Sequence, residues 1–232
     1  MLPTSDQSAA AYVDLRRRLT DVLADVPDGL AATTPVPACP GWTVTDLVAH
    51  VYGVPRDVLD GNLDGAGTAS WTAAQVGRFA PRGLAELLDE WNRAAPEFET
   101  VLAGVPDGIA ARIAFDTGAH EHDLRGALGR PGGRGADTVL IGLGFMVEGM
   151  AGFVARQSLP GVEFVTPGYA TTLGEGPGRV RVETDTFTLY RTVTGRRSAA
   201  QVRALPWEGD PFPYLAMFAG SPLALPDVDI VE

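Results

Sequence analysis

Apolar residues recur at intervals of three and four along most of the first 157 positions, a spacing that predicts amphipathic helices. The predicted helices cover about 5–26, 43–54, 71–79, 81–105, 109–128 and 137–157. Between them lie stretches rich in glycine, proline and aspartate, which favour turns. We therefore expect a helical bundle in this part of the chain.

The pattern changes after Pro160. Three stretches, 161–167, 178–184 and 187–193, place β-branched and aromatic residues at alternate positions and so predict strands. Two later stretches, 198–205 and 211–220, predict short helices. We therefore predict a mostly α protein, with a helical-bundle domain at residues 1–158 and a small α+β domain at residues 159–232.

The acidic composition limits the classes of macromolecule that the protein is expected to bind. The formal net charge is -11, and all 18 basic residues are arginine, because the sequence contains no lysine. Nucleic acids and anionic membranes would both repel such a chain, so we expect neither as a partner.

Three features predict a cytoplasmic protein. Cys39 is the single cysteine, so no internal disulfide can form. The N-terminal residues do not show the basic and apolar regions of a signal peptide. The most apolar stretch, Thr138 to Ala155, contains Glu148 and four glycines, so it is predicted to be a buried core helix rather than a membrane span.

The three histidines are confined to two short stretches. The first stretch ends at His50 and begins a helix, because Thr43 is a favourable N-cap and Asp46 can complete a capping box. His50 follows the apolar Leu47 by about one helical turn, so it is predicted to point inward or into a cleft.

The second stretch lies in the predicted helix at about 109–128. Asp116 and His120 are four residues apart and fall on its apolar stripe, where a lone carboxylate is costly. With His50 from a neighbouring helix, they would form three ligands with an open position, the arrangement of catalytic zinc. Asp123 is placed to accept a hydrogen bond from the far nitrogen of His120.

Other interpretations of these residues stay open. His50 alone is more often a packed core histidine, and Asp116 with His120 can form a buried ion pair. Glu121 and His122 are predicted to be solvated or to support the ligands from behind. Cys39 is predicted to be a buried packing residue rather than a nucleophile or a ligand.

The motifs "PACPGWTVTDLVAHVYGV" and "HEHDLRGALGRPG" resemble the mycothiol-dependent maleylpyruvate isomerase family, within the wider DinB-like superfamily. The segment "FTLYRTVTGRRSAAQVRALPWEGD" is similar to the smaller domain of that family. The resemblance implies a DinB-like up-down four-helix bundle with zinc, or another divalent metal, between helices. His50 and His120 match the family's histidine ligands, and Asp116 stands where the family has glutamate.

The resemblance also implies a chemistry. Zinc would hold the sulfur of a low-molecular-weight thiol such as mycothiol as a thiolate, which attacks an electrophilic carbon. Addition followed by elimination gives isomerisation, whereas a retained sulfur bond gives S-transfer. Arg191, Arg196 and Arg197 are candidates to pair with an anionic substrate, although each taken alone is more simply a solvated surface residue.

Three classes of function therefore compete. The first is a zinc- and thiol-dependent isomerase or S-transferase whose partners are the thiol and a small-molecule substrate. The second is a metal-binding regulatory bundle without catalysis, and the third is a metal-dependent hydrolase. The identity of the substrate and the choice between monomer and homodimer stay open.

Overall fold

The computed structural model describes residues 2–175, 179–219 and 225–232. The chain divides into two compact units, Pro3–Gly133 and Arg134–Val231; Leu2 groups with the second and Glu232 with the first. The helices of the first unit are α1 (Ser5–Leu23), α2 (Asp28–Ala31), α3 (Val44–Asp60), α4 (Ala69–Phe79), α5 (Leu84–Gly104) and α6 (Asp107–Ala127).

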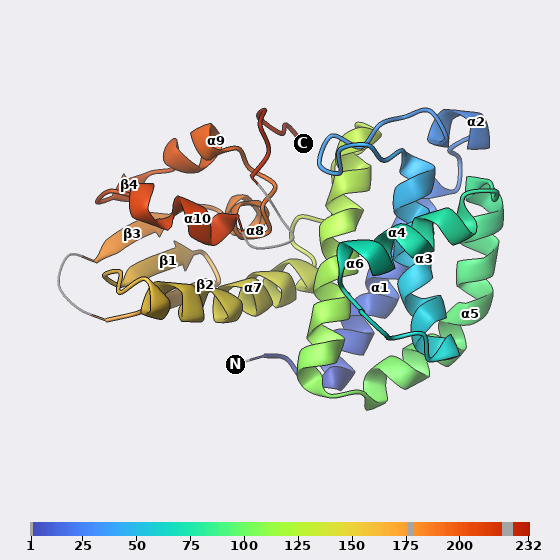
Figure 1. The fold of residues 1–232 in the computed structure, drawn as a ribbon, viewed down its shortest axis with the longest axis horizontal. Helices are drawn as coiled ribbons and strands as arrows, with labels where there is room; N and C mark the ends of the chain where they lie inside the picture. The colour runs from blue at the N-terminus through green and yellow to red at the C-terminus, as the bar shows by residue number, and fades with distance from the viewer. Residues whose placement is uncertain (1, 176–178, 220–224) are drawn as a thin grey trace. The chain divides into compact units, whose positions relative to one another are not determined.

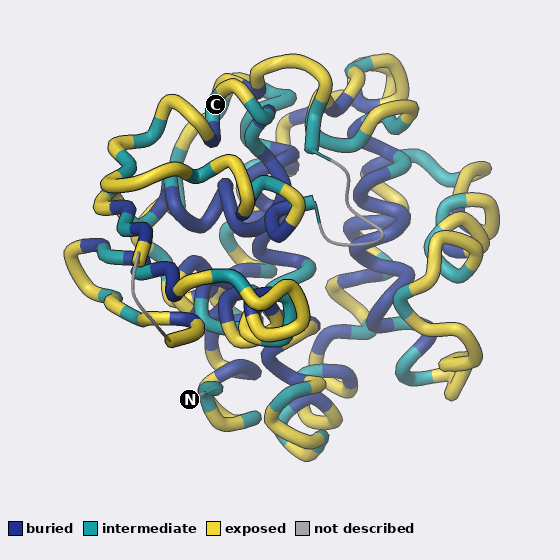
Figure 2. The backbone as a smooth tube through the Cα atoms, turned by 60° about the vertical axis from the view of Figure 1, so that its left-hand side comes forward, coloured by how far each residue is buried: buried dark blue, intermediate teal, exposed yellow. Residues whose placement is uncertain are grey.

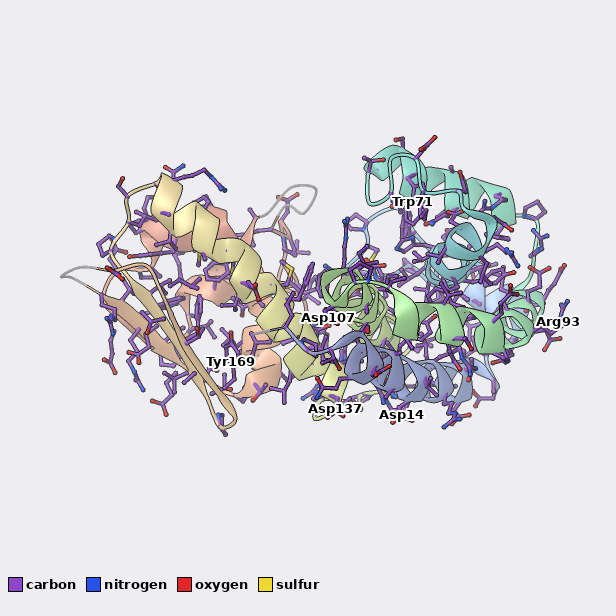
Figure 3. The ribbon with its side chains drawn as sticks, turned by 90° about the horizontal axis from the view of Figure 1, so that it is seen from below. Asp14, Trp71, Arg93, Asp107, Asp137 and Tyr169 are labelled. Carbon is purple, nitrogen blue, oxygen red and sulfur yellow. The ribbon has the colours of Figure 1, made fainter. Side chains whose placement is uncertain are left out.

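Four long helices form the bundle of the first unit (Figure 1). Helix α1 packs on α5 and α6, and α3 packs on α4, α5 and α6. Their buried side chains form one apolar core that includes Tyr12, Leu15, Leu47, Trp91 and Phe98. Figure 2 shows this burial along the inner sides of the helices, whereas polar residues such as Asp14 and Arg93 lie on the outside (Figure 3). The predicted fold class is confirmed.

Helix α3 begins where the sequence predicts. The Asp46 carboxylate accepts from the Thr43 backbone N–H at 2.9 Å, and the Thr43 hydroxyl accepts from the Asp46 N–H at 3.2 Å. The helix continues past its predicted end because Pro55 is accommodated inside it, at the loss of one backbone donor. It ends at Asp60 and is capped by Gly61, whose left-handed φ of 71° suits a residue without a Cβ.

The capping box of α3 is expected to stabilise the whole bundle unit. Thr43→Ala removes one acceptor for the helix N-terminus, so the free energy of unfolding should fall by about 1 kcal/mol. Urea unfolding followed by circular dichroism measures this. Thr100→Ala, on the exposed surface inside α5, should cost little, because alanine has the higher helix propensity. Equal losses in the two variants would contradict a capping role.

The second unit combines a four-stranded sheet with helices. Strand order is β2-β1-β3-β4; β1 pairs antiparallel with β2 and parallel with β3, and β3 pairs antiparallel with β4. Helix α7 packs on α8, α10 and β2. The elements are α7 (Asp137–Arg156), β1 (Val162–Thr166), β2 (Tyr169–Leu173), β3 (Val180–Glu183), α8 (Thr186–Val193), α9 (Ala199–Arg203), β4 (Trp207–Glu208), a 3-10 turn (Phe212–Tyr214) and α10 (Leu215–Phe218).

Two of the three predicted strands are present, as β1 and β3, whereas the strand predicted at 187–193 is wrong. That segment is helix α8, which begins where the Asp185 carboxylate accepts from the Thr188 N–H at 2.8 Å. The helix is only eight residues long, and most of its residues are threonine, aromatic or valine, which have high β-propensity, so the sequence resembled a strand. The strand β2 was not predicted, and Gly178 and Gly220, at the ends of predicted segments, lie outside the described residues.

The division between the two compact units falls after Gly133, whereas the sequence predicts a domain boundary at residue 158. The difference is α7, which buries side chains against α8 and β2 of the second unit. Among the described residues, α7 is the one helix long and apolar enough to cross a membrane by length and composition, a test that the core helix of a folded domain also passes. Its apolar window is 44% buried in this protein.

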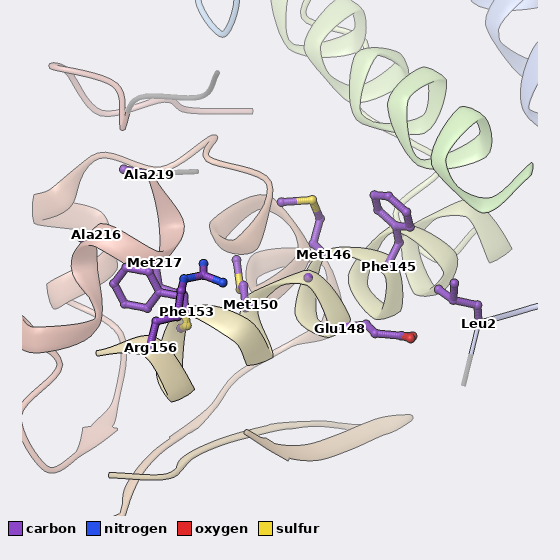
Figure 4. Close-up of a pocket in the computed structure, with 11 residues that line it drawn as sticks. Leu2, Phe145, Met146, Glu148, Met150, Phe153, Arg156, Ala216, Met217 and Ala219 are labelled. Carbon is purple, nitrogen blue, oxygen red and sulfur yellow. The ribbon is translucent and has the colours of Figure 1, made fainter. Parts of the chain in front are cut away.

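A cavity of about 640 Å³ lies against α7 in the second unit (Figure 4). Its lining is mostly apolar, with Glu148 and Arg156 as charged members. The lining residues include no cluster of nucleophilic or metal-binding side chains. The predicted metal ligands, in contrast, all lie in the helical bundle.

Candidate metal centre

The structure brings the three predicted ligand residues together. His50 comes from α3, and Asp116 and His120 come from successive turns of α6. The Nε2 atom of His50 lies 3.4 Å from Oδ2 of Asp116, and Nε2 of His120 lies 3.9 Å from Oδ1. The two imidazole rings meet edge to face with centroids 5.1 Å apart.

Burial separates the histidines from the carboxylate. His50 and His120 are only 4% and 7% exposed, whereas the Asp116 side chain is 36% exposed. Burial lowers the pKa of His120 below its ordinary value, although the hydrogen bond to Asp123 and the charge of Asp116 act against this shift. His120 is therefore a neutral imidazole near neutral pH, the form that binds a metal.

The predicted contact between Asp123 and His120 is present. Nδ1 of His120 lies 2.8 Å from Oδ2 of Asp123, whose side chain is buried. A carboxylate accepts here, so Nδ1 donates and Nε2 keeps its lone pair on the side of Asp116. Such support behind a histidine ligand is common in metal sites and raises the basicity of the ligand.

His50 has a matching partner that sequence reasoning missed. Its Nδ1 lies 2.7 Å from Oε1 of Gln75, a buried residue of α4. The helix at 71–79 was predicted, but no local pattern connects it with His50. The only sequence signal is that Gln75 and Phe79 lie four residues apart, and these are the two buried residues of α4.

The trio fits a divalent cation. Imidazole nitrogen and carboxylate oxygen are normal zinc ligands, and tetrahedral geometry places such ligands about 3.3 Å apart. The separations of 3.4 and 3.9 Å in the protein lie near this value. Among the described residues, no fourth His, Cys, Asp or Glu joins this trio. A cation held there would keep an open coordination position, as catalytic zinc does.

Cys39 corrects a prediction in part. It packs against the apolar core as predicted but is only partly buried, and its Sγ lies 3.6 Å from Oδ2 of Asp123 and 3.9 Å from Nδ1 of His120. Cys39, His120 and Asp123 form a second group with metal-binding spacing. The thiol lies on the Nδ1 side of the His120 ring, whereas Asp116 lies on the Nε2 side. Nδ1 itself donates to Asp123.

Glu121 and His122, which were predicted to be solvated or to support the ligands from behind, are both buried. Glu121 is fully buried and its carboxylate accepts from Arg18 and Arg125, so it belongs to an ion-pair cluster rather than to the ligand trio. His122 is only 3% exposed and belongs to neither group with metal-binding spacing. The last part of α6 is buried on several sides, which the one-sided stripe drawn from the sequence did not anticipate.

The three arginines belong to the second unit. Arg191 is fully buried and Arg196 is nearly so, which corrects the interpretation of these two as solvated surface residues. Arg196 donates to the Thr194 carbonyl at 2.7 Å, and the partly buried Arg197 donates to the Arg196 carbonyl at 2.8 Å. Their pairing with a substrate anion stays a prediction.

The fold and the site define a protein with a helical bundle that carries a His-His-Asp trio suited to a divalent metal. Residues 12–125, which include the whole trio, match the family described as the mycothiol maleylpyruvate isomerase N-terminal domain. Through this domain the chain belongs to the mycothiol maleylpyruvate isomerase family. No curated protein sequence compared with the chain matches it.

Two solved structures share the fold. The crystal structure of the mycothiol-dependent maleylpyruvate isomerase has a TM-score of 0.60 and 14% identity, covering 90% of this chain and 95% of that chain. A histidine-to-alanine mutant of the mycothiol-dependent maleylpyruvate isomerase has a TM-score of 0.59 and 14% identity, covering 84% and 90%. At this identity the likeness shows the architecture, and residue roles rest on the geometry above.

Proposed function

We propose that this protein is a zinc- and mycothiol-dependent isomerase or S-transferase that acts on a small electrophilic substrate. The observation that carries the proposal is the convergence of two Nε2 atoms, from His50 and His120, on the Asp116 carboxylate. Membership of the maleylpyruvate isomerase family supports mycothiol as the thiol.

Each residue of the centre has a distinct role. His50, Asp116 and His120 hold the cation, and Asp123 and Gln75 prevent the two rings from turning. A bound divalent cation supplies the positive charge that keeps a thiol deprotonated near neutral pH. Asp116 is the most exposed of the three ligands, so the thiol and the substrate approach from its side.

The reaction follows from the nucleophile. A thiolate adds to one carbon of a conjugated double bond, the resulting single bond rotates, and elimination of the same thiolate restores the double bond in the other geometry. If the new carbon–sulfur bond is kept and the carbanion is protonated, the result is S-transfer. An anionic substrate also needs a cation, and Arg191, Arg196 and Arg197 are the residues proposed to supply it.

Cobalt substitution tests the thiol step. The cobalt-loaded protein should develop a sulfur-to-cobalt charge-transfer band when mycothiol is added, and the same sample should isomerise maleylpyruvate or add the thiol to a related electrophile. S-methyl mycothiol, whose sulfur cannot be deprotonated, is the matched control and should leave the spectrum unchanged. An unchanged spectrum at saturating mycothiol would contradict thiol dependence and favour the hydrolase or the non-catalytic bundle.

A further inference from the structure

Behind His50 lies a line of buried polar side chains that the ligand trio does not explain. Gln75 of α4 places Oε1 2.7 Å from Nδ1 of His50 and Nε2 2.7 Å from Oδ2 of Asp57. Gln75 and Asp57 are each about 1% exposed. Burying an amide and a carboxylate is costly unless both are hydrogen-bonded, so these contacts are needed to hold the groups in place.

The orientation of the Gln75 amide follows from Asp57. Oδ1 of Asp57 accepts from Arg78 at 2.7 Å and from Asn62 at 2.9 Å. A carboxylate paired with arginine has only acceptor atoms, so the group of Gln75 that faces it must be the NH₂ donor. The amide oxygen is therefore directed at His50, and Nδ1 of His50 must carry the hydrogen of that bond.

The packing of α4 keeps Gln75 at this position. A Cβ added at Gly53 of α3 would lie 2.7 Å from Cβ of Gln75, so only glycine lets the two helices approach this closely. The other buried residue of α4 is Phe79, which packs on Tyr52 with ring centroids 4.9 Å apart. Helix α4 lies beside α3 (Figure 1) and is attached to it through Phe79, Gln75 and Arg78.

We propose that Gln75 is a positioning residue, which fixes His50 in the Nδ1–H tautomer and so presents the Nε2 lone pair to the cation. The inference rests on the metal centre of the proposed function, but the tautomer itself can be measured without metal. Asp57, Arg78 and Asn62 determine which way the amide points.

The test uses Gln75→Met, which keeps the length of the side chain and removes both hydrogen bonds. Metal-free protein labelled with ¹⁵N-histidine is studied by two-bond ¹H–¹⁵N correlation at about pH 9, above the ordinary imidazole pKa of about 6.5. Only three histidines contribute signals, and His50→Ala assigns the relevant one. We expect Nδ1–H for His50 in the native chain and a shift toward Nε2–H in Gln75→Met. Zinc affinity should fall about 10- to 100-fold.

Two further variants separate positioning from general loosening of α4. Thr68→Ala removes the N-cap of α4, whose hydroxyl accepts from the Trp71 N–H at 3.3 Å, and should change neither the tautomer nor the zinc affinity. Gly53→Ala displaces Gln75 without removing it and should reproduce the effect of Gln75→Met, which keeps the test valid if that variant does not fold.

The outcomes are distinguishable. Nε2–H for His50 in the native chain, or an unchanged tautomer in both Gln75→Met and Gly53→Ala, would overturn the inference. A shifted tautomer in a protein that binds no zinc would support the positioning of His50 and contradict the proposed function instead.

Discussion

The His120→Ala variant is expected to lose bound zinc, from about one ion per chain to near zero, together with all thiol-dependent activity. His120 supplies one of two imidazoles, and its removal leaves His50 and the partly exposed Asp116 as the only ligands of the trio. Two ligands are one fewer than catalytic zinc sites use.

Metal content after dialysis against excess zinc and then against metal-free buffer measures the effect. His122→Ala is the matched control, because it removes an equally buried histidine from the same helix and should keep the zinc. Thermal unfolding gives a second measurement. Zinc at 100 times its Kd should stabilise the native chain by about 2.7 kcal/mol and leave His120→Ala unaffected. If His120→Ala retained zinc while His122→Ala lost it, the assignment of the ligands would be wrong.

The start of α3 and the inward position of His50 could be predicted because both are local. Thr43 and Asp46 are three residues apart, so their capping contacts depend on one turn of helix. Asp116 and His120 are neighbours on α6 for the same reason. Local spacing could not show that α3 lies against α6. That prediction depended on the apolar face of each helix and on the resemblance to a known family.

The contacts of Cys39 and Gln75 could not be predicted, because they depend on tertiary packing. Cys39 precedes α3 in the sequence, yet its neighbours His120 and Asp123 lie on α6, more than 80 residues later. Gln75 approaches His50 only because Gly53 lets α4 pack closely on α3. Helix α8 was mistaken for a strand because its few residues are mostly threonine, aromatic or valine, and tertiary packing overrides their β-propensity.

A second large effect is expected at Glu121, next in sequence to His120 but with a different role. Its carboxylate is fully buried and accepts from Arg18 Nε at 3.2 Å, Arg18 Nη2 at 2.9 Å and Arg125 Nε at 3.0 Å. The contact joins α1 to α6, helices that pack closely in the bundle. A Cβ at Gly133 would approach Oε1 of Glu121 to 2.8 Å, so the loop after α6 covers this pair.

Glu121→Ala should lower the free energy of unfolding by about 3 kcal/mol, because removing one member of a buried ion pair leaves the other charges without compensation. Arg125 is the more affected partner, with a side chain only 12% exposed, whereas water can solvate Arg18 in part. Glu121→Gln keeps the shape and an acceptor oxygen, so its cost should be about 1–2 kcal/mol. Urea unfolding with a common slope measures both values.

The exposed pair of Arg56 and Asp60 provides the control, since both ends of that contact reach solvent. Asp60→Ala should change the stability by no more than about 0.5 kcal/mol. Zinc content separates the role of Glu121 from that of its neighbour, because a structural ion pair that lies outside the ligand trio should leave the metal in place in the folded protein. Loss of zinc in Glu121→Gln without loss of stability would contradict the structural role and return Glu121 to the metal centre.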